Sequence, residues 1–211
     1  ILALEAHRAG ALVVAEDLGV VEPWGRGYLH DRGILGTSIA WFGRDAAGQP
    51  LPPDSWREYC LASVTTHDLP PTAGYLAGDH IRLQHELGLL TESLDAELAT
   101  AQAELSAFID ALRRGGFLAQ DSTEVEDIVL ALHRYLVATP SRVLCAALTD
   151  AVGERRTQNQ PGTHLEYPNW RVPLAGPDGR PLLLEEAFTD ARTFRLAAVM
   201  NEIGGSLDPA G

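Results

Sequence analysis

The sequence predicts an α/β fold in which a mainly parallel sheet is covered by helices. Short uncharged runs rich in Val, Ile, Ala and Thr recur along the chain, and such runs are typical of buried strands. Between the last two of these runs, apolar residues return at alternating spacings of three and four, which indicates amphipathic helices. Because strand-like and helical segments alternate, we expect parallel strands with the helices outside them.

Four segments have the composition of strands: Ala11–Ala15, Gly36–Phe42, Ala62–Thr66 and Arg142–Leu148. Polar residues follow two of them abruptly. Glu16 and Asp17 come directly after the first, and His67 and Asp68 come after the third, where Pro70-Pro71 prevents a simple continuation. Chemistry in α/β barrels sits at the carboxyl ends of strands. Glu16 and Asp68 are therefore the candidate catalytic pair.

Residues 74–140 have a helical texture. One apolar stripe comprises Leu94, Leu98, Ala101, Leu105, Phe108 and Leu112. It is shorter than the three to four heptads that a coiled coil usually needs, so we interpret it as helix packing rather than a partner zipper. A second apolar face covers residues 125–136, one helical turn is expected within Trp56–Leu61, and a last helix is expected over Thr189–Ile203, closed by Gly204-Gly205.

These elements predict a partial barrel over residues 1–211, with residues 74–140 as a helical insertion. Four strands are too few for a closed eight-stranded barrel, and an open half leaves unpaired edges. The chain begins without Met inside an amphipathic segment, Ile1–His7, which Gly10 closes. We therefore expect a piece of a longer protein, and we expect the piece alone to self-associate through its open edge.

Composition excludes several classes of partner. The formal net charge is −13 and every one of the 16 basic residues is Arg, without a basic cluster. This balance argues against nucleic acid and anionic membranes, and it suits a neutral or cationic ligand. Two cysteines are too few for a disulfide framework. No signal peptide and no run of about 18 apolar residues is present, so we expect a cytoplasmic protein.

Each candidate residue also has a simpler interpretation. Glu16 and Asp17 could form an acidic turn after a strand, and we interpret Asp17 itself as a turn or capping residue. Asp68 could cap a helix that begins at Leu69, and a lone His67 is more often structural than a ligand.

Metal and nucleotide sites are not supported. His80 and His85 lie five residues apart without a His-Glu-x-x-His run, so a zinc site is not expected. The glycine spacing matches neither common nucleotide fingerprint, which leaves these residues as turn glycines: Gly19, Gly25, Gly27, Gly33 and Gly36.

Three motifs occur together in a fixed order: Ala15-Glu16-Asp17-Leu18-Gly19, Thr66-His67-Asp68-Leu69-Pro70, and Pro161-Gly162-Thr163 with Glu166-Tyr167-Pro168-Asn169-Trp170-Arg171. Each motif alone is weak. Their combination, with the helical insertion between them, resembles the C-terminal half of the 4-alpha-glucanotransferases, the amylomaltase or disproportionating enzymes of glycoside hydrolase family 77. The resemblance covers nearly the whole chain.

The resemblance implies a fold, a reaction and a set of roles. The family fold is a (β/α)8 barrel with helical insertions, and the reaction passes an α-1,4-glucan segment to another sugar with retention. Glu16 matches the general acid/base, Asp68 the transition-state stabiliser and His67 a ligand of sugar hydroxyls. Asn159 falls where the family lines its groove. The nucleophilic Asp belongs to a strand before Ile1, and no metal or organic cofactor is required.

The chemistry agrees with these roles. A retaining transfer needs an acid/base carboxyl and a nucleophilic carboxylate about 5–5.5 Å apart. The acid/base needs a raised pKa. The parent is thus expected to disproportionate maltooligosaccharides, and the fragment alone to be inactive. The alternative is a free-standing carbohydrate-binding or assembly module built on half a barrel.

The four tryptophans could stack on sugar rings, but packing in the core or anchoring of loops is the simpler interpretation for each: Trp24, Trp41, Trp56 and Trp170. The segment Tyr167–Arg171 is interpreted as a structural tie that pins the last loop under the barrel.

Overall fold

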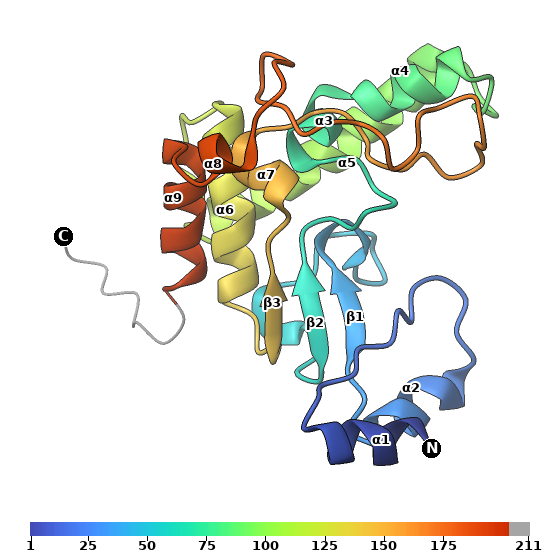
Figure 1. The fold of residues 1–211 in the computed structure, drawn as a ribbon. Coiled ribbons are helices and arrows are strands. Elements are labelled where there is room, and N and C mark those ends of the chain that lie inside the picture. Colours follow the sequence, from blue (N-terminus) through green and yellow to red (C-terminus); the bar gives the residue numbers. More distant parts are fainter. Residues whose placement is uncertain (203–211) are drawn as a thin grey trace.

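A small parallel sheet lies at the centre of the molecule, with helices around it (Figure 1). The structure is a computed structural model and describes residues 1–202. Within them the sheet has the strand order β1-β2-β3, with β1 at Gly36–Ile39, β2 at Cys60–Ser63 and β3 at Val143–Cys145. Both pairings are parallel, with Gly36 opposite Cys60 and Leu61 opposite Val143. The predicted helix-rich α/β class is therefore confirmed.

The first predicted strand is reduced to a single parallel bridge between Val14 and Leu35. Leu35 N–H donates to Val13 O at 3.0 Å, and Ala15 N–H donates to Leu35 O at 2.7 Å. The prediction of a buried strand was wrong here, because Leu12 is 76% exposed and Val14 39%. This segment pairs with the edge of β1 at one bridge only. Its pairing stops at Thr37, whose backbone N–H donates to the Asp17 side chain.

The other strands are shorter than predicted. β1 ends at Ile39, where a 3₁₀ turn over Ala40–Phe42 begins. β2 starts two residues earlier than predicted and ends at Ser63. The helical turn expected within Trp56–Leu61 is wrong, since the turn lies at Pro53–Ser55. An apolar run marks where a strand is buried, but backbone pairing with the neighbouring strand decides where it ends.

The helices fall at the two ends of the sheet and beside it. α1 (Leu2–Ala9) ends at Gly10, whose φ of 60° is the left-handed cap that glycine favours, and α2 (Pro23–His30) begins with proline at its first turn. Both lie near the amino ends of the strands (Figure 1). The remaining helices are α3 (Thr72–Ala77), α4 (Asp79–Glu86), α5 (Leu94–Arg114), α6 (Val125–Val137), α7 (Leu148–Val152), α8 (Leu184–Ala187) and α9 (Ala191–Met200).

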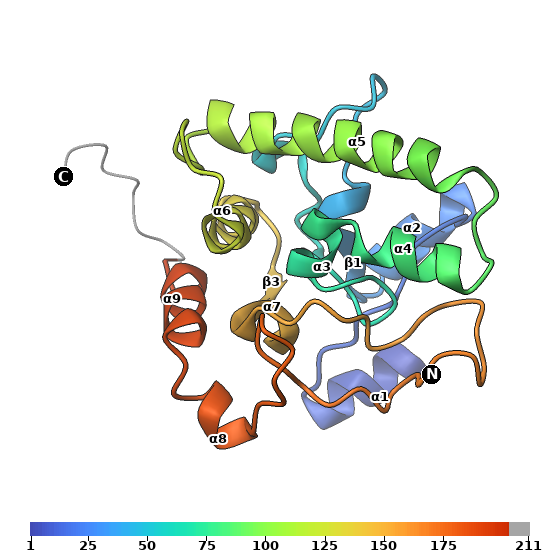
Figure 2. The same ribbon diagram turned by 90° about the horizontal axis from the view of Figure 1, so that it is seen from above.

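Figure 2 looks at the molecule from above, with the carboxyl side of the sheet toward the viewer. α3, α4 and the orange segment after α7 lie in front, while α1 and α2 are more distant. Loops that follow the strands therefore gather on the same side as the long segment between α7 and α8. The glycines expected to close the last helix lie outside the described residues.

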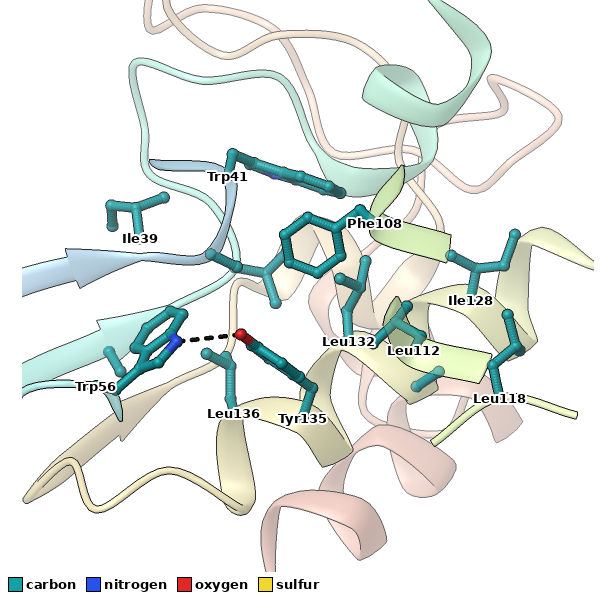
Figure 3. Close-up of a cluster of buried hydrophobic side chains, with 14 of the residues drawn as sticks. Ile39, Trp41, Trp56, Phe108, Leu112, Leu118, Ile128, Leu132, Tyr135 and Leu136 are labelled. Carbon is teal, nitrogen blue, oxygen red and sulfur yellow. Dashed lines mark hydrogen bonds between the residues drawn. The ribbon is translucent and has the colours of Figure 1, made fainter. Parts of the chain in front are cut away.

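The main core fills the space between the sheet and the helices α5 and α6 (Figure 3). Cys60, Ala62 and Val64 point from β2 and its extension into this core. Phe108 and Leu112 come from the predicted stripe and are fully buried, whereas the first half of the stripe is only half-buried. Burying each large apolar side chain stabilises the fold by about 1.5–3 kcal/mol. The interpretation of the stripe as helix packing is confirmed.

Alternation along the strands divides the sheet into two faces. Cys60 and Ala62 face the core, so Leu61 and Ser63 face the opposite side. Register places Thr37 and Val143 beside Leu61 on that second face. We call this the inner face. Ile39, opposite Ser63 at the end of β1, lies on the same face and nevertheless belongs to the main core cluster.

Candidate functional site

The loop after β2 carries His67 and Asp68 and is fixed by short-range hydrogen bonds. Thr65 Oγ1 donates to Pro70 O at 2.9 Å, and Leu69 N–H donates to Thr66 O at 3.2 Å. The Asp68 backbone N–H donates to Thr66 Oγ1 at 3.3 Å. A rigid turn of this kind lets a strand present a polar side chain at a defined place.

Three residues predicted from the sequence meet at Asp68. Asn159 Nδ2 donates to Asp68 Oδ1 at 2.7 Å. His67 Nε2 lies 3.3 Å from Asp68 Oδ2. The side chains of His67 and Asp68 remain 49% and 42% exposed, so they can still reach a ligand. The alternative that Asp68 caps a helix is not supported, because α3 begins at Thr72 and has no side-chain cap.

Asn159 reaches Asp68 from a loop that is tied to itself. Asn169 Oδ1 accepts from Gln160 N–H at 2.7 Å, and Asn169 Nδ2 donates to Thr163 Oγ1 at 2.8 Å. Tyr167 OH donates to Thr157 O at 2.6 Å. The Tyr167–Arg171 segment does form ties within this loop, and they hold the backbone on both sides of Asn159. The predicted place under the barrel is wrong, because Trp170 of this segment lies against His67 on the carboxyl side of the sheet.

Trp170 joins this cluster, although sequence reasoning favoured packing or anchoring for it. Its ring centroid lies 5.4 Å from that of His67 with a tilt of 38°, and the residue is 64% exposed. Its φ of 62° is an uncommon conformation for a bulky non-glycine residue. Strained backbone of this kind concentrates at functional sites. An exposed indole beside a histidine and a carboxylate suits the flat face of a sugar ring, which is apolar on one side and carries hydroxyls at its rim.

The other tryptophans divide between core and surface. Trp41 and Trp56 are buried in the main core, as the simpler interpretation predicts, whereas Trp24 is 67% exposed on α2.

Glu16 is exposed and follows the bridged segment. Val14 pairs with Leu35, and alternation places both on the inner face with Thr37. Asp17 N–H donates to Ala15 O at 3.0 Å, which closes a three-residue turn about Glu16. Glu16 and Asp68 thus both follow parallel segments on the carboxyl side, with β1 between those segments. Among the described residues no hydrogen bond joins Glu16 to the Asp68 cluster.

Asp17 is a buried ion-paired residue, which corrects its interpretation as a turn or capping residue. Its side chain is 3% exposed and lies 2.6 Å from Arg57 Nη1 and 3.3 Å from Arg26 Nε. Burial raises the pKa of the Asp17 carboxyl, but the hydrogen bonds from Arg57 and Thr37 and the arginine charges outweigh it and leave the pKa below its ordinary value. Thr37 and Arg57 lie 20 and 40 positions away, so local sequence could not identify these two hydrogen-bond partners.

The remaining candidates carry no site of their own. Within the described residues no three His, Cys, Asp or Glu side chains gather closely enough to hold a metal ion. His80 stacks on Tyr75 with centroids 4.9 Å apart, and burial lowers its pKa. None of the helices in the described part of the chain combines the length and apolar character needed to cross a membrane.

Comparison with known proteins identifies relatives over most of this chain. The family model of 4-alpha-glucanotransferase, Glyco_hydro_77, matches residues 1–177. The 4-alpha-glucanotransferase of Mycobacterium tuberculosis H37Rv is 65% identical over 202 residues, covering 93% of this chain and 28% of the relative. The enzyme of the same name from Haemophilus influenzae is 28% identical over 185 residues, covering 84% of this chain and 26% of the relative. The chain therefore spans less than a third of these relatives.

Solved structures give the same result. The amylomaltase from Corynebacterium glutamicum superposes with a TM-score of 0.89 at 40% identity, covering 94% of this chain and 30% of that one. The amylomaltase from Streptococcus agalactiae in complex with acarbose gives 0.59 at 21% identity, covering 93% and 32%, and it supports the fold alone.

Proposed function

This chain belongs to the 4-alpha-glucanotransferase family, and we propose from that membership that it supplies part of the active site of a retaining 4-alpha-glucanotransferase. The observation that carries the proposal is the contact set of Asp68, which accepts a hydrogen bond from Asn159 and lies beside His67. The substrate is a maltooligosaccharide or another α-1,4-glucan. The activity belongs to the full-length protein that carries this chain.

Asp68 is the transition-state stabiliser in this proposal. Asn159 and His67 fix its two oxygens, while its partly exposed lone pairs remain free to accept hydrogen bonds from sugar hydroxyls. Such bonds strengthen as the sugar approaches the oxocarbenium-like transition state. His67 binds a sugar hydroxyl, and Asn159 keeps the carboxylate oriented. A pre-set carboxylate saves reorganisation at the moment of bond cleavage.

Glu16 is the general acid/base. It first protonates the leaving glycosidic oxygen and then takes a proton from the acceptor hydroxyl. The nucleophilic carboxylate comes from outside these 211 residues, and residues 1–211 form the later part of a (β/α)8 barrel with residues 74–140 inserted. This arrangement is supported by the parallel alignment of the segment at Val14 with the strands β1, β2 and β3. We accordingly propose that the chain alone is inactive.

The rival function is a non-catalytic carbohydrate-binding module. The exposed Trp170 beside His67 favours it, because a stacking ring and a few polar groups suffice for binding without chemistry. The two functions differ in what an isosteric change at Glu16 does. A binding module tolerates it, whereas a transferase loses its proton transfer.

The test measures glucose release from maltotriose by the full-length protein that carries this chain. Glu16→Gln is expected to lower kcat by about 10²–10⁴-fold, the range of general acid–base catalysis, while glucan binding is largely kept. Glu92→Gln, a change at an exposed glutamate, is the matched control. Full turnover by Glu16→Gln would overturn the assignment, and transferase activity of the 211-residue chain alone would refute its inactivity.

We also propose that the isolated chain self-associates through its edge. Leu12 and Val14 are exposed there, and an open strand edge pairs readily with another copy. Light scattering at increasing concentration is expected to show a rising mass. A monodisperse monomer throughout would contradict this.

A further inference from the structure

The backbone around Glu16 is held at both of its neighbours by a single residue of the next strand. Thr37 Oγ1 donates to Ala15 O at 3.0 Å. Thr37 N–H donates to Asp17 Oδ1 at 2.7 Å. Glu16 therefore sits between two anchors that both lead to Thr37, while its own side chain is exposed.

The second anchor replaces a bond of the sheet. The bonds Leu35 N–H to Val13 O and Ala15 N–H to Leu35 O follow the parallel pattern, in which Thr37 N–H would next donate to Ala15 O. The Asp17 carboxylate takes that N–H instead. The ladder ends at this point, and the three-residue turn about Glu16 becomes possible.

Arg57 holds the Asp17 carboxylate in the position where it can accept from Thr37. Its Nη1 donates to Asp17 Oδ2 at 2.6 Å and its Nη2 donates to Oδ1 at 3.2 Å. Its Nε donates to Ser38 Oγ at 3.2 Å, and its Nη2 also contacts Thr37 O. The planar fork thus fixes Asp17 to β1 itself, with a geometry that lysine cannot reproduce.

Gly36 leaves the space that this arrangement needs. A Cβ at residue 36 would lie 2.6 Å from Arg57 Nη1 and 2.9 Å from Asp17 Oδ1. Gly36 pairs with Cys60, which points into the main core. Asp17 consequently lies on the core side of the sheet, whereas the side chain of the adjacent Glu16 is exposed.

We propose that Asp17, fixed by Arg57, is the positioning residue that ends the first strand and directs Glu16 toward the inner face. This inference rests on the acid/base role proposed for Glu16. Asp17 itself contacts no substrate, because it is buried on the opposite side. It acts by fixing the direction of the neighbouring carboxyl group, and a displacement of about 1 Å can cost about 10²-fold in rate.

The test uses the full-length protein and compares Asp17→Ala, Asp17→Asn and Arg57→Lys. Asp17→Ala removes both the Thr37 and the Arg57 bonds, and we expect kcat to fall about 10²-fold with the donor KM within about twofold of wild type. Asp17→Asn keeps an oxygen for Thr37, and we expect a smaller fall, about tenfold. Arg57→Lys keeps the positive charge but loses the planar guanidinium, and its kcat is expected to fall by about tenfold as well.

Two further measurements separate positioning from simple stability. Leu196→Ala truncates a buried side chain of α9 that packs in a small separate cluster with Leu130, Ala151 and Val199. It lowers the melting temperature without contacting Glu16, and its kcat is expected to stay near wild type. The pH profile of kcat is expected to shift in Asp17→Asn and to remain unchanged in Leu196→Ala.

A kcat within twofold of wild type in Arg57→Lys or Asp17→Asn, with an unchanged pH profile, would overturn the inference. If Asp17→Ala does not fold, Arg57→Lys and Asp17→Asn still test the inference. Normal turnover by Glu16→Gln would instead refute the acid/base role, so the two failures are distinguishable.

Discussion

Asn159 and Asp68 lie 91 positions apart in the chain and share a hydrogen bond of 2.7 Å between Nδ2 and Oδ1. The bond joins the loop after β2 to the loop after α7. His67 approaches the other carboxylate oxygen, so the orientation of Asp68 depends on two different segments. A site built in this way is sensitive to charge as well as to geometry, because an amide donor and a carboxylate are in direct contact.

Asn159→Asp is expected to place a second carboxyl group against Asp68 in place of the amide donor. Two carboxyl groups in hydrogen-bond contact disfavour double ionisation, so the new pair shares a proton that the amide and carboxylate of the wild type do not. Activity that needs an ionised Asp68 should then fall on the acidic side, and the acidic limb of the pH profile of kcat/KM should move upward. Asn201→Asp, at an exposed asparagine at the end of α9, is the control. Superimposable acidic limbs for wild type and Asn159→Asp would contradict this.

Trp170→Gly is expected to separate stability from binding. The backbone of Trp170 has a φ of 62°. This conformation costs an L-residue about 1–2 kcal/mol and glycine almost nothing. Relief of that cost should offset the loss of the His67 contact, so the unfolding free energy stays close to wild type. Trp170→Ala keeps the cost and should be less stable. Both variants should bind maltooligosaccharide about tenfold more weakly, as loss of one aromatic contact predicts.

Calorimetric titration measures the affinity for maltooligosaccharide, and urea unfolding measures the unfolding free energy. Trp24→Ala removes an exposed indole from α2 and serves as the control, with binding unchanged. Wild-type affinity in both Trp170 variants would show that the indole does not contact the glucan.

Sequence patterns located the polar residues at the strand ends, because abrupt changes from apolar to polar residues are local. Asp68 and His67 were found in this way, whereas Asn159 was named only because the family resemblance implied it. Asp17 was misinterpreted because what buries it, Arg57 and Thr37, lies far away in the chain. The left-handed backbone at Trp170 has no local indication either, since tryptophan itself disfavours it.

The positions where strands begin and end were also harder to predict, because they depend on contacts with segments that are distant in the sequence. The apolar run Ala11–Ala15 predicted a buried strand, yet a strand is buried only if neighbours cover it. Here Leu12 is largely exposed, and only one row of pairing with Leu35 forms. The helical stripe was predicted more successfully because its period of 3.6 residues persists over α5, and long periodic segments depend less on distant partners.

Tyr135→Phe is expected to destabilise the core although it adds no cavity. Tyr135 OH accepts from Trp56 Nε1 at 3.1 Å and also bonds Leu51 O (Figure 3 shows the Trp56 bond). Removing the hydroxyl leaves a buried indole N–H without its acceptor, and an unsatisfied buried donor costs about 1–3 kcal/mol. Denaturant unfolding should show a loss of that size. Tyr28→Phe, at an exposed tyrosine, should change stability by less than about 0.5 kcal/mol. Equal losses in the two variants would contradict the role of the hydrogen bond.

Glu154 is expected to contribute to the pH dependence of stability. Its side chain is 1% exposed and lies 2.7 Å from Arg156 Nη2, and its Oε2 also accepts from Ala175 N–H at 2.8 Å. Burial raises the pKa of this carboxyl, but the bonds from Arg156 and the backbone outweigh it and hold the pKa below its ordinary value. The folded state therefore binds its proton less readily than the unfolded chain does. The stabilisation is present above the unfolded pKa and is lost as pH falls through the folded one.

The measurement is the unfolding free energy of wild type and Glu154→Gln at pH 7, 4.5 and 3. Wild type should be the more stable at pH 7, because Glu154→Gln leaves Arg156 without its carboxylate partner. The difference between the two proteins should shrink as the pH falls below about 4.3, where a free glutamate takes up its proton. Glu92→Gln, at an exposed glutamate, should follow wild type at every pH. A difference between wild type and Glu154→Gln that stays constant from pH 7 to 3 would mean that ionisation of Glu154 is not linked to folding.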